Sequence, residues 1–365
     1  MSALFSPFSI GELELRNRIV IAPMCQYSAI DGNATDWHLI HLGQMALSGA
    51  GLLIIEATAV EPEGRITPSD LGIWSGNNVE SINRLLTSIR KYSDMPIAIQ
   101  LAHAGRKASC KVPWEGGKSL SPGQGGWVTK APSPIPFAEN DRTPNQLNKE
   151  GIESIKYAFV EAAKRSYELG FDAIEIHAAH GYLLHQFLSP ISNQRDDEYG
   201  GTTKNRLRLT LEIFESVRNS VPMNMPVGIR ISGTDWVDGG WDIDQSIELA
   251  LELKKLGCAF IHVSSGGLSP HQTIPLKPNY QVHLANAVRK ESGMPTIAVG
   301  LITEPLQAEK ILLDEQADLV ALARGMLYDP RWPWHAAAKL GAKVDAPPQY
   351  LRSHPVGLEN LFKGK

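Results

Sequence analysis

Short runs of apolar residues recur along the whole chain, and each has the length of a strand that is buried on both faces. The pattern predicts eight strands, at residues 19–23, 52–57, 97–103, 173–177, 227–232, 260–264, 296–300 and 319–324. Amphipathic stretches with helical spacing lie between them, such as residues 150–169 and 243–256. Gly170 and Gly257 directly follow these two stretches, where a glycine commonly ends a helix.

Alternation of strands and helices favours parallel strands that are joined by right-handed crossovers. Eight such units close a barrel, so the sequence predicts an α/β fold, a single (β/α)8 TIM barrel that spans residues 1–365 as one domain. A doubly wound dinucleotide-binding sheet is disfavoured because no Gly-x-Gly-x-x-Gly follows the first strand.

One long segment, residues 104–148, departs from this alternation. It follows the third predicted strand, is rich in Gly, Pro and Ser, and contains Trp114 and Trp127. Long irregular segments inside a compact domain are usually functional loops, so we expect this one to cover the catalytic face of the barrel. The two tryptophans would either shape the mouth of a substrate site or pack the loop onto the barrel.

Composition narrows the class of protein. The formal charge is −4 and no basic tail is present, which argues against nucleic acid or an anionic membrane as a partner. The sequence has no run of 18 apolar residues, and Glu12, Glu14 and Arg16 stand where a signal peptide needs an apolar stretch. Its three cysteines cannot form a closed disulfide framework, so we expect a protein of the reducing cytoplasm.

Two histidines and a tyrosine follow the fourth apolar run, in the stretch His177-Ala-Ala-His180-Gly-Tyr182. Side chains at the carboxyl ends of barrel strands are the ones that face a ligand. Two neutral imidazoles at this point can donate to one oxygen atom, with the Tyr182 phenol as a nearby proton source. The pattern therefore indicates a site that polarises a carbonyl.

Two other interpretations of the histidine pair stay open. A histidine at a strand end is often a hydrogen-bonded structural group. A His-x-x-His spacing also occurs in metal sites, because neutral imidazole is a common ligand. Zinc needs further ligands, and Glu175 lies inside the strand, where it alternates away from His180. We therefore predict that no metal is bound.

The ends of the other strands add a second theme. Gly300 follows the seventh strand and Arg324-Gly325 the eighth, which matches the common phosphate site of barrel enzymes. Gln100 and Arg230, on the third and fifth strands, offer an amide and a guanidinium that suit a heteroaromatic ring. Flavin mononucleotide (FMN), a flat phosphorylated cofactor, fits both features.

Together these residues resemble the Old Yellow Enzyme family, specifically its thermophilic-like class, over about residues 4–352. The resemblance rests on five motifs: Pro23-Met24-Cys25-x-Tyr27, Glu56-Ala-Thr-Ala-Val60, Gln100-Leu-Ala-His-Ala-Gly-Arg-Lys107, His177-Ala-Ala-His-Gly-Tyr182 and Ala346-Pro-Pro-Gln-Tyr350-x-Arg352. It implies a TIM barrel with non-covalent FMN, reduction by NADPH, and ene-reductase activity on enones or related electrophiles such as nitro compounds. Residues 353–365 continue beyond the family pattern.

The resemblance also implies roles for individual residues. Those implied for FMN are Pro23, Met24, Cys25, Ala57, Gln100, Arg230, Gly300, Arg324 and Gly325, and those implied for substrate are Tyr27, His177, His180, Tyr182 and Arg352. The histidines would hold the substrate carbonyl while hydride reaches the β carbon, and Tyr182 would protonate the α carbon. Cys25 would tune the flavin potential. Lys107 would contact the flavin or remain a solvated loop residue.

In the thermophilic-like class a terminal arginine enters the neighbouring subunit's site, so we expect a homodimer or homotetramer in which Arg352 does so. The default for a chain end is a disordered terminus. Two other functions fit parts of the sequence: a non-catalytic flavin redox sensor that uses Cys25, and a Schiff-base aldolase with Lys107 as nucleophile.

Overall fold

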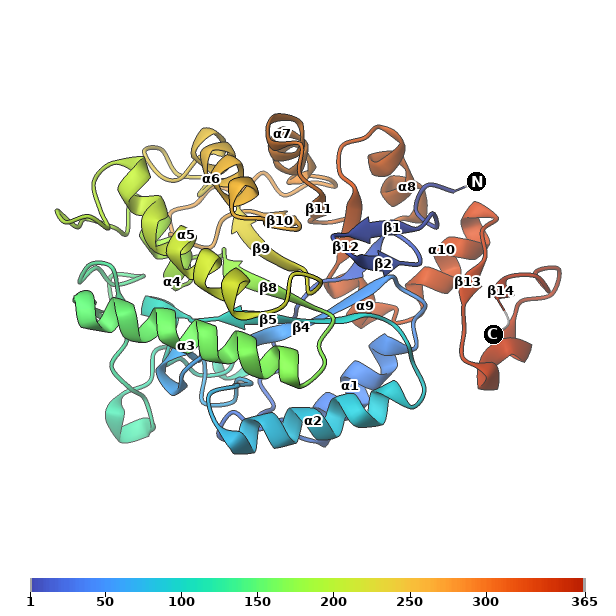
Figure 1. Cartoon of the computed structure of the whole chain (residues 1–365), viewed down its shortest axis with the longest axis horizontal. Helices are drawn as coiled ribbons and strands as arrows, with labels where there is room; N and C mark the ends of the chain where they lie inside the picture. The colour runs from blue at the N-terminus through green and yellow to red at the C-terminus, as the bar shows by residue number, and fades with distance from the viewer. Residues whose placement is uncertain (1, 364–365) are drawn as a thin grey trace.

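The computed structural model describes residues 2–363, and eight parallel strands close a barrel at its centre (Figure 1). In chain order these strands are β3 (Ile19–Ile21), β4 (Leu52–Ala59), β5 (Ile97–Ala102), β8 (Ala173–Ala178), β9 (Val227–Ser232), β10 (Ile261–Ser264), β11 (Thr296–Val299) and β12 (Leu319–Leu322). β12 pairs with β3, which completes the ring. The predicted TIM barrel and all eight predicted strands are confirmed, with strand ends within two residues of the prediction.

Helices surround the barrel on the outside. They are α1 (Asp36–Ala46), α2 (Gly76–Arg90), α3 (Lys149–Glu168), α4 (Leu183–Leu188), α5 (Thr203–Ser220), α6 (Ile243–Lys255), α7 (Val282–Ser292), α8 (Pro305–Leu313), α9 (Arg324–Tyr328) and α10 (Trp332–Leu340). The two helices predicted by range, α3 and α6, begin and end within one residue of the prediction. Gly170 and Gly257 follow them with φ of 79°, a conformation that glycine adopts without steric cost.

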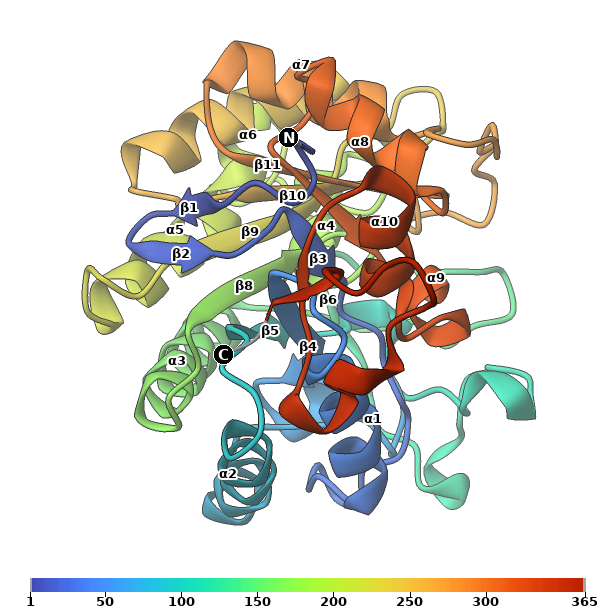
Figure 2. The ribbon, with the colours of Figure 1, turned by 90° about the vertical axis from the view of Figure 1, so that its right-hand side faces the viewer.

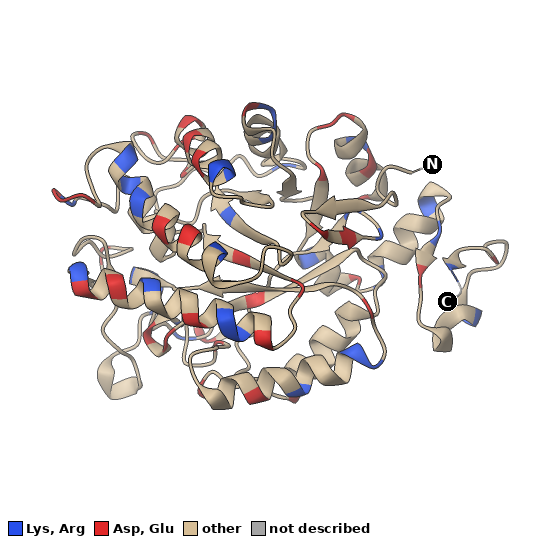
Figure 3. Cartoon of the chain, in the orientation of Figure 1, with Lys and Arg blue, Asp and Glu red and all other residues tan. Residues whose placement is uncertain are grey.

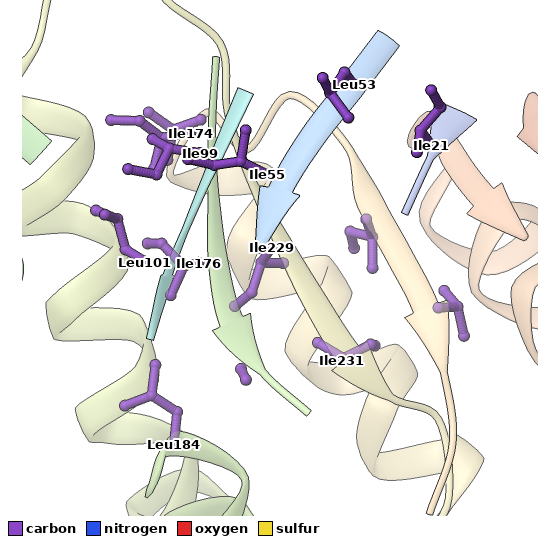
Figure 4. Close-up of a cluster of buried hydrophobic side chains, with 14 of the residues drawn as sticks. Ile21, Leu53, Ile55, Ile99, Leu101, Ile174, Ile176, Leu184, Ile229 and Ile231 are labelled. Carbon is purple, nitrogen blue, oxygen red and sulfur yellow. The ribbon is translucent and has the colours of Figure 1, made fainter. Parts of the chain in front are cut away.

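Two apolar layers pack the barrel, as expected when successive residues of a strand point to opposite faces. The outer layer lies between strands and helices and includes Ile99, Ile174 and Ile229 (Figure 4). The inner layer fills the barrel with side chains such as Leu52 and Phe260. Ile10 and Leu15 join this inner layer from the hairpin of β1 (Phe8–Ile10) and β2 (Leu13–Leu15), which closes the amino-terminal end (Figure 2).

The loop at residues 104–148 is irregular, as predicted, with three 3-10 turns and a two-residue strand pair. These elements are η2 (Gly105–Lys107), η3 (Pro113–Glu115), η4 (Pro122–Gln124), β6 (Lys130–Ala131) and β7 (Asn145–Gln146), while η1 (Pro62–Gly64) precedes α2. Arg195 donates to the carbonyls of Pro132 (2.9 Å) and Leu147 (2.6 Å), and Arg106 donates to that of Leu268 (2.9 Å). The loop is therefore packed against the barrel rather than a free lid.

The segment after α10 folds back on itself. η5 (Pro348–Ser353) lies between β13 (Val344–Asp345) and β14 (Phe362–Lys363), which pair in parallel. Phe362 packs against Trp334, with ring centroids 4.8 Å apart. This segment lies at the amino-terminal end of the barrel, on the right in Figure 1, whereas the carboxyl ends of the strands point to the left. Most of the residues after the family pattern thus belong to the folded structure.

Charged residues lie mainly on the outer helices and the loops (Figure 3). Among residues 2–363, no helix is both long enough and apolar enough to cross a membrane.

Candidate active site

The neighbouring strands β5, β8, β9 and β10 bring polar side chains together inside the barrel. The strand register aligns His177 with Arg230 and Arg230 with His262, across three neighbouring strands. The register also aligns Gln100 with Glu175. All five residues are buried, and none is more than 6% exposed. They form one continuous polar surface, which we call the polar wall.

His177, His180 and Tyr182 form a compact group at the end of β8. The His177 ring lies edge-on to both others, with centroids 5.2 Å from His180 and 5.0 Å from Tyr182. His177 Nδ1 accepts from the Ala179 amide, so its Nε2 carries the proton. His180 Nε2 lies 2.7 Å from Ser264 Oγ. The structure therefore brings the three predicted residues together.

Burial keeps this group neutral. It lowers the pKa of His177 and of His180 well below the usual value, and the nearby Arg230 adds to the effect in both cases. Burial also raises the pKa of Tyr182 well above its usual value, so the phenol keeps its proton. Neutral imidazoles and a phenol are hydrogen-bond donors, as the sequence analysis requires. Within the described chain, no three His, Cys, Asp or Glu side chains are grouped so as to hold a metal ion.

Arg230 is the least expected feature of the polar wall. It is 6% exposed, and among the described residues its guanidinium has no hydrogen-bond or ion-pair partner. A buried cation without a partner is costly, and burial lowers the pKa of Arg230 accordingly. An anionic group of a ligand would relieve this cost. The pyrimidine edge of a flavin is such a group, because negative charge develops there when the ring is reduced.

Glu175 organises the residues around Arg230. It accepts from Gln100 Nε2 at 2.7 Å, and its other oxygen lies 2.8 Å from His262 Nδ1. The Gln100 amide oxygen is left as an acceptor for a ligand. Sequence reasoning did not assign a role to Glu175 or His262, although a carboxylate and an imidazole inside apolar strands are signals that could have found them.

The loop after β3 forms a second side of the site. Pro23, Met24, Cys25 and Tyr27 are partly exposed there, and the neighbouring Gln26 amide donates to Glu56 Oε2 (3.0 Å). A bulge in β4 between Ile55 and Ala57 brings Glu56 into this position, where it also pairs with His38 (3.2 Å). Burial raises the pKa of the Cys25 thiol well above its usual value, with a further contribution from Asp70.

The two tryptophans of the long loop have different surroundings. Trp114 meets Tyr27 edge-on at 6.0 Å and is 68% exposed, which places it at the edge of the site. Trp127 instead donates to the Glu63 carbonyl (2.9 Å) and packs against Arg65. Trp127 thus packs the loop onto the barrel, whereas a role of Trp114 at the mouth of a substrate site stays a prediction.

The phosphate residues predicted from sequence lie on neighbouring strands. β11 and β12 pair with Val299 opposite Ala321, so Gly300 and the Arg324-Gly325 start of α9 follow at the same edge. Gly300 has φ of 116°, and a Cβ there would stand 2.4 Å from Gln281 Nε2, so only glycine fits. Arg324 is exposed.

The surroundings of Lys107 and the position of Arg352 could not be inferred from the sequence. Lys107 is neither solvated nor free for a flavin, because its Nζ donates to the carbonyls of His180 and Gly267, each at 2.8 Å. Burial, together with the charge of Arg106, lowers the pKa of Lys107 to about 8. Arg352 is exposed on η5, at the opposite end of the barrel from its own chain's site.

A parallel barrel with this polar wall and a phosphate-ready edge defines a class of flavin enzymes. A family model described as the NADH:flavin oxidoreductase / NADH oxidase family matches residues 3–342, and the chain belongs to this family. The resemblance to Old Yellow Enzyme is thereby confirmed, as are an oxidoreductase activity, FMN as cofactor and a nicotinamide dinucleotide as reductant.

Individual relatives agree with this assignment. The NADPH dehydrogenase of Geobacillus thermodenitrificans is 43% identical over 353 residues, covering 96% of this chain and 98% of that protein. The NADPH dehydrogenase of Listeria innocua serovar 6a is 44% identical over 355 residues, covering 97% and 99%. Morphinone reductase in complex with tetrahydroNAD superposes with a TM-score of 0.76 at 26% identity, covering 100% of this chain and 95% of that one.

A more distant structure supports the fold alone. 2-Naphthoyl-CoA reductase superposes with a TM-score of 0.80 at 24% identity over 93% of this chain, which spans only 52% of that longer protein.

Proposed function

We propose that the protein is an ene-reductase: hydride passes from NADPH by way of bound FMN to the β carbon of an α,β-unsaturated carbonyl or nitro compound, and Tyr182 protonates the α carbon. The observation that carries this proposal is the group of three neutral donors at the end of β8, His177, His180 and Tyr182. Negative charge grows on the substrate oxygen as hydride arrives, and donors fixed in a buried site stabilise such charge.

FMN would lie between the polar wall and the loop after β3. Arg230 would meet the anionic edge of the ring, and the free oxygen of Gln100 would accept from its imide N–H. Pro23, Met24, Cys25 and Ala57 would pack against the ring from β3 and β4. Gly300, Arg324 and Gly325 would hold the phosphate at the edge formed by β11 and β12.

The substrate would lie above the ring. His177 Nε2 carries a proton that no described residue accepts, so it is available to a carbonyl oxygen. His180 would turn its Nε2 from Ser264 to the same oxygen. Tyr27, with Trp114 behind it, would line the entrance. Since the phenol of Tyr182 remains protonated far above neutral pH, it is suited to act as general acid.

The test is a spectrum followed by turnover. The purified protein should be yellow with one FMN per chain, NADPH should bleach the colour without oxygen, and cyclohexenone should restore it. A colourless preparation that takes up no FMN contradicts the cofactor assignment. Flavin that is bleached by NADPH and not reoxidised by any enone or nitroalkene contradicts the substrate class.

The two alternative functions receive less support. A redox sensor needs a thiolate, whereas burial raises the pKa of Cys25 and keeps the thiol form. An aldolase needs a lysine amine directed at substrate. A pKa of about 8 would suit that role, but Lys107 Nζ is directed at two backbone carbonyls.

We also propose that a second copy of the chain completes the site, with Arg352 of each subunit contacting substrate in the other. Arg352 is exposed, and no other residue in the described part of the chain forms a hydrogen bond or ion pair with it. Gel filtration with light scattering should give a dimer or tetramer. Arg352→Ala should raise KM for enones while FMN binding stays unchanged, and a monomeric, fully active enzyme contradicts the proposal.

A further inference from the structure

The backbone between His180 and Tyr182 has an unusual environment. His180 has φ of 57° and Gly181 φ of 74°, so two successive residues are left-handed. Glycine adopts this conformation freely, but a residue with a side chain adopts it only at a steric cost. Such a conformation persists only where the surroundings impose it. We call residues 179–182 the His180 turn.

Side chains bind all four polar backbone groups of the two left-handed residues. The His180 amide donates to Ser232 Oγ (2.9 Å), and the His180 carbonyl accepts from Lys107 Nζ (2.8 Å). The Gly181 amide donates to His185 Nδ1 (2.9 Å), and the Gly181 carbonyl accepts from Gln186 Nε2 (2.7 Å). The turn is thus fixed by contacts from β9, η2 and α4 rather than by its own sequence.

We propose that His185, oriented by Asp235, is a positioning residue that fixes the His180 turn and thereby directs the His180 imidazole and the Tyr182 phenol at the substrate. This inference rests on the proposed function, because it assigns a purpose to the geometry of those two side chains. His185 itself is not among the residues proposed to contact FMN or substrate. It is fully buried on the first turn of α4.

The hydrogen bond from Gly181 determines the tautomer of His185. An imidazole nitrogen that accepts from a backbone amide is unprotonated, so the His185 proton is on Nε2. Nε2 lies 2.8 Å from Asp235 Oδ1, although its N–H does not point straight at that oxygen. Asp235 is the group that favours this tautomer, because its carboxylate can only accept.

Asp235 is itself fixed in place and charged. Ser189 Oγ (2.6 Å) and the Trp241 amide (2.8 Å) both donate to its second oxygen. Burial acts to raise the pKa of Asp235, but His185 and these two donors outweigh burial and lower it. Burying a carboxylate such as that of Asp235 has a large desolvation free energy. Through His185, the Asp235 carboxylate keeps an acceptor in place for the Gly181 amide.

Three substitutions at Asp235 and His185, with one control, separate this role from simple packing. Asp235→Asn keeps the shape, but its amide N–H next to Nε2 favours the other tautomer, whose Nδ1–H opposes the Gly181 amide. His185→Leu removes the acceptor, whereas His185→Asn places an amide oxygen near the position of Nδ1. Leu253→Ala, in the buried face of α6, is the control for lost stability alone.

We expect a selective effect on one half of the reaction in the FMN-loaded enzyme. Asp235→Asn and His185→Leu should slow flavin reoxidation by cyclohexenone by about 10- to 100-fold, as small misplacements of catalytic groups do. Flavin reduction by NADPH should change much less. The charge-transfer band formed with phenol should weaken in parallel, and His185→Asn should restore most of both signals. Equal slowing of the two half-reactions, or an Asn variant no better than Leu, overturns the proposal.

A second measurement does not depend on enone turnover. In the full-length protein as purified, ¹⁵N shifts of labelled histidine should report the Nε2–H tautomer for His185, and the Gly181 amide should exchange slowly with solvent. Gly181 exchange should accelerate in Asp235→Asn and His185→Leu but not in Leu253→Ala. Unchanged exchange contradicts the positioning role. If wild-type protein fails to reduce enones while these signals behave as expected, the proposed function fails and the structural part of this inference stands.

Discussion

The two halves of the barrel interior differ in kind near the catalytic end. The half built from β5, β8, β9 and β10 carries the polar wall, with Gln100, Glu175, His177, Arg230 and His262. The half built from β11, β12, β3 and β4 contributes small or branched apolar side chains to the inner layer, namely Ala22, Ile54, Val299 and Ala321, and its buried carboxylate, Glu56, lies at the bulge of β4.

This difference suits the proposed binding of FMN, in which the two halves of the barrel would have different roles. The polar half concentrates charge, including an arginine without a hydrogen-bond or ion-pair partner among the described residues, and we expect an anionic ligand to stabilise it. The apolar half offers backbone groups at Gly300 and Gly325, and its side chains serve packing. Substitutions in the polar half should alter chemistry more than stability, and those in the apolar half should do the reverse.

The largest effect should come from Tyr182→Phe, which removes the proposed proton donor of the polar half and keeps the ring. General acid catalysis is typically worth about 100- to 10,000-fold, so flavin reoxidation by cyclohexenone should slow by that order. Flavin reduction by NADPH should stay near wild type in stopped-flow measurements. Tyr199→Phe, whose phenol contacts Glu212 outside the site (3.1 Å), is the matched control. Unchanged reoxidation would mean that solvent supplies the proton.

A somewhat smaller effect is expected for His177→Ala and for His180→Ala. Each removes one proposed donor to the substrate oxygen, and loss of such a donor typically costs on the order of 100-fold in rate. Phenol binding should weaken in the same variants, as a titration of its charge-transfer band would show. His335→Ala, on the exposed face of α10, serves as control. Full enone turnover in both site variants would exclude the carbonyl-binding role.

Arg230→Met tests whether Arg230 in the polar half contributes to FMN binding rather than to the stability of the protein. The substitution should weaken FMN binding by about 10- to 100-fold, the worth of a hydrogen bond to a charged group. The apoprotein should melt no lower than wild type, because a buried cation without a partner has been removed. Arg218→Met gives the opposite pattern, since Arg218 is buried but donates to carbonyls including that of Val221 (3.0 Å). Lower stability with intact FMN affinity in Arg230→Met contradicts the assignment.

The features that the sequence could predict are local ones. The strands are apolar runs bounded by turn residues, so all eight were predictable from pattern alone. His177, His180 and Tyr182 follow one strand directly, so their proximity was predictable too.

Contacts between distant segments were not predictable. Lys107 reaches the carbonyl of Gly267, 160 residues away, and Asp235, in the loop after β9, meets His185 on α4. No periodicity encodes such pairs. The charge of Glu175 inside a buried strand was a visible signal, but its partners His262 and Gln100 depend on strand register.

Acid should loosen the loop that lies after β5 in the polar half. Burial acts to raise the pKa of Glu61, but contacts with His103 and then Lys130 outweigh it and lower the pKa to about 2. Because the folded-state pKa is depressed, the stabilisation is complete above the unfolded value near 4.3 and is lost as pH falls toward 2. Glu61→Gln should lose this pH dependence in thermal melts. Identical melting curves for both proteins between pH 5 and 2 would contradict the prediction.

The smallest effect tests the apolar half. Ile54 is 1% exposed and lies in the inner layer, so Ile54→Val should cost about 0.5–1.5 kcal/mol of stability by removing one methyl group. Both half-reactions and the affinity for FMN should stay at wild-type values, because Ile54 supplies packing and no polar group. Denaturant unfolding and stopped-flow kinetics on the same preparation measure the two quantities. A kinetic change with unaltered stability would mean that the apolar half also shapes the chemistry, and the division between the halves would not hold.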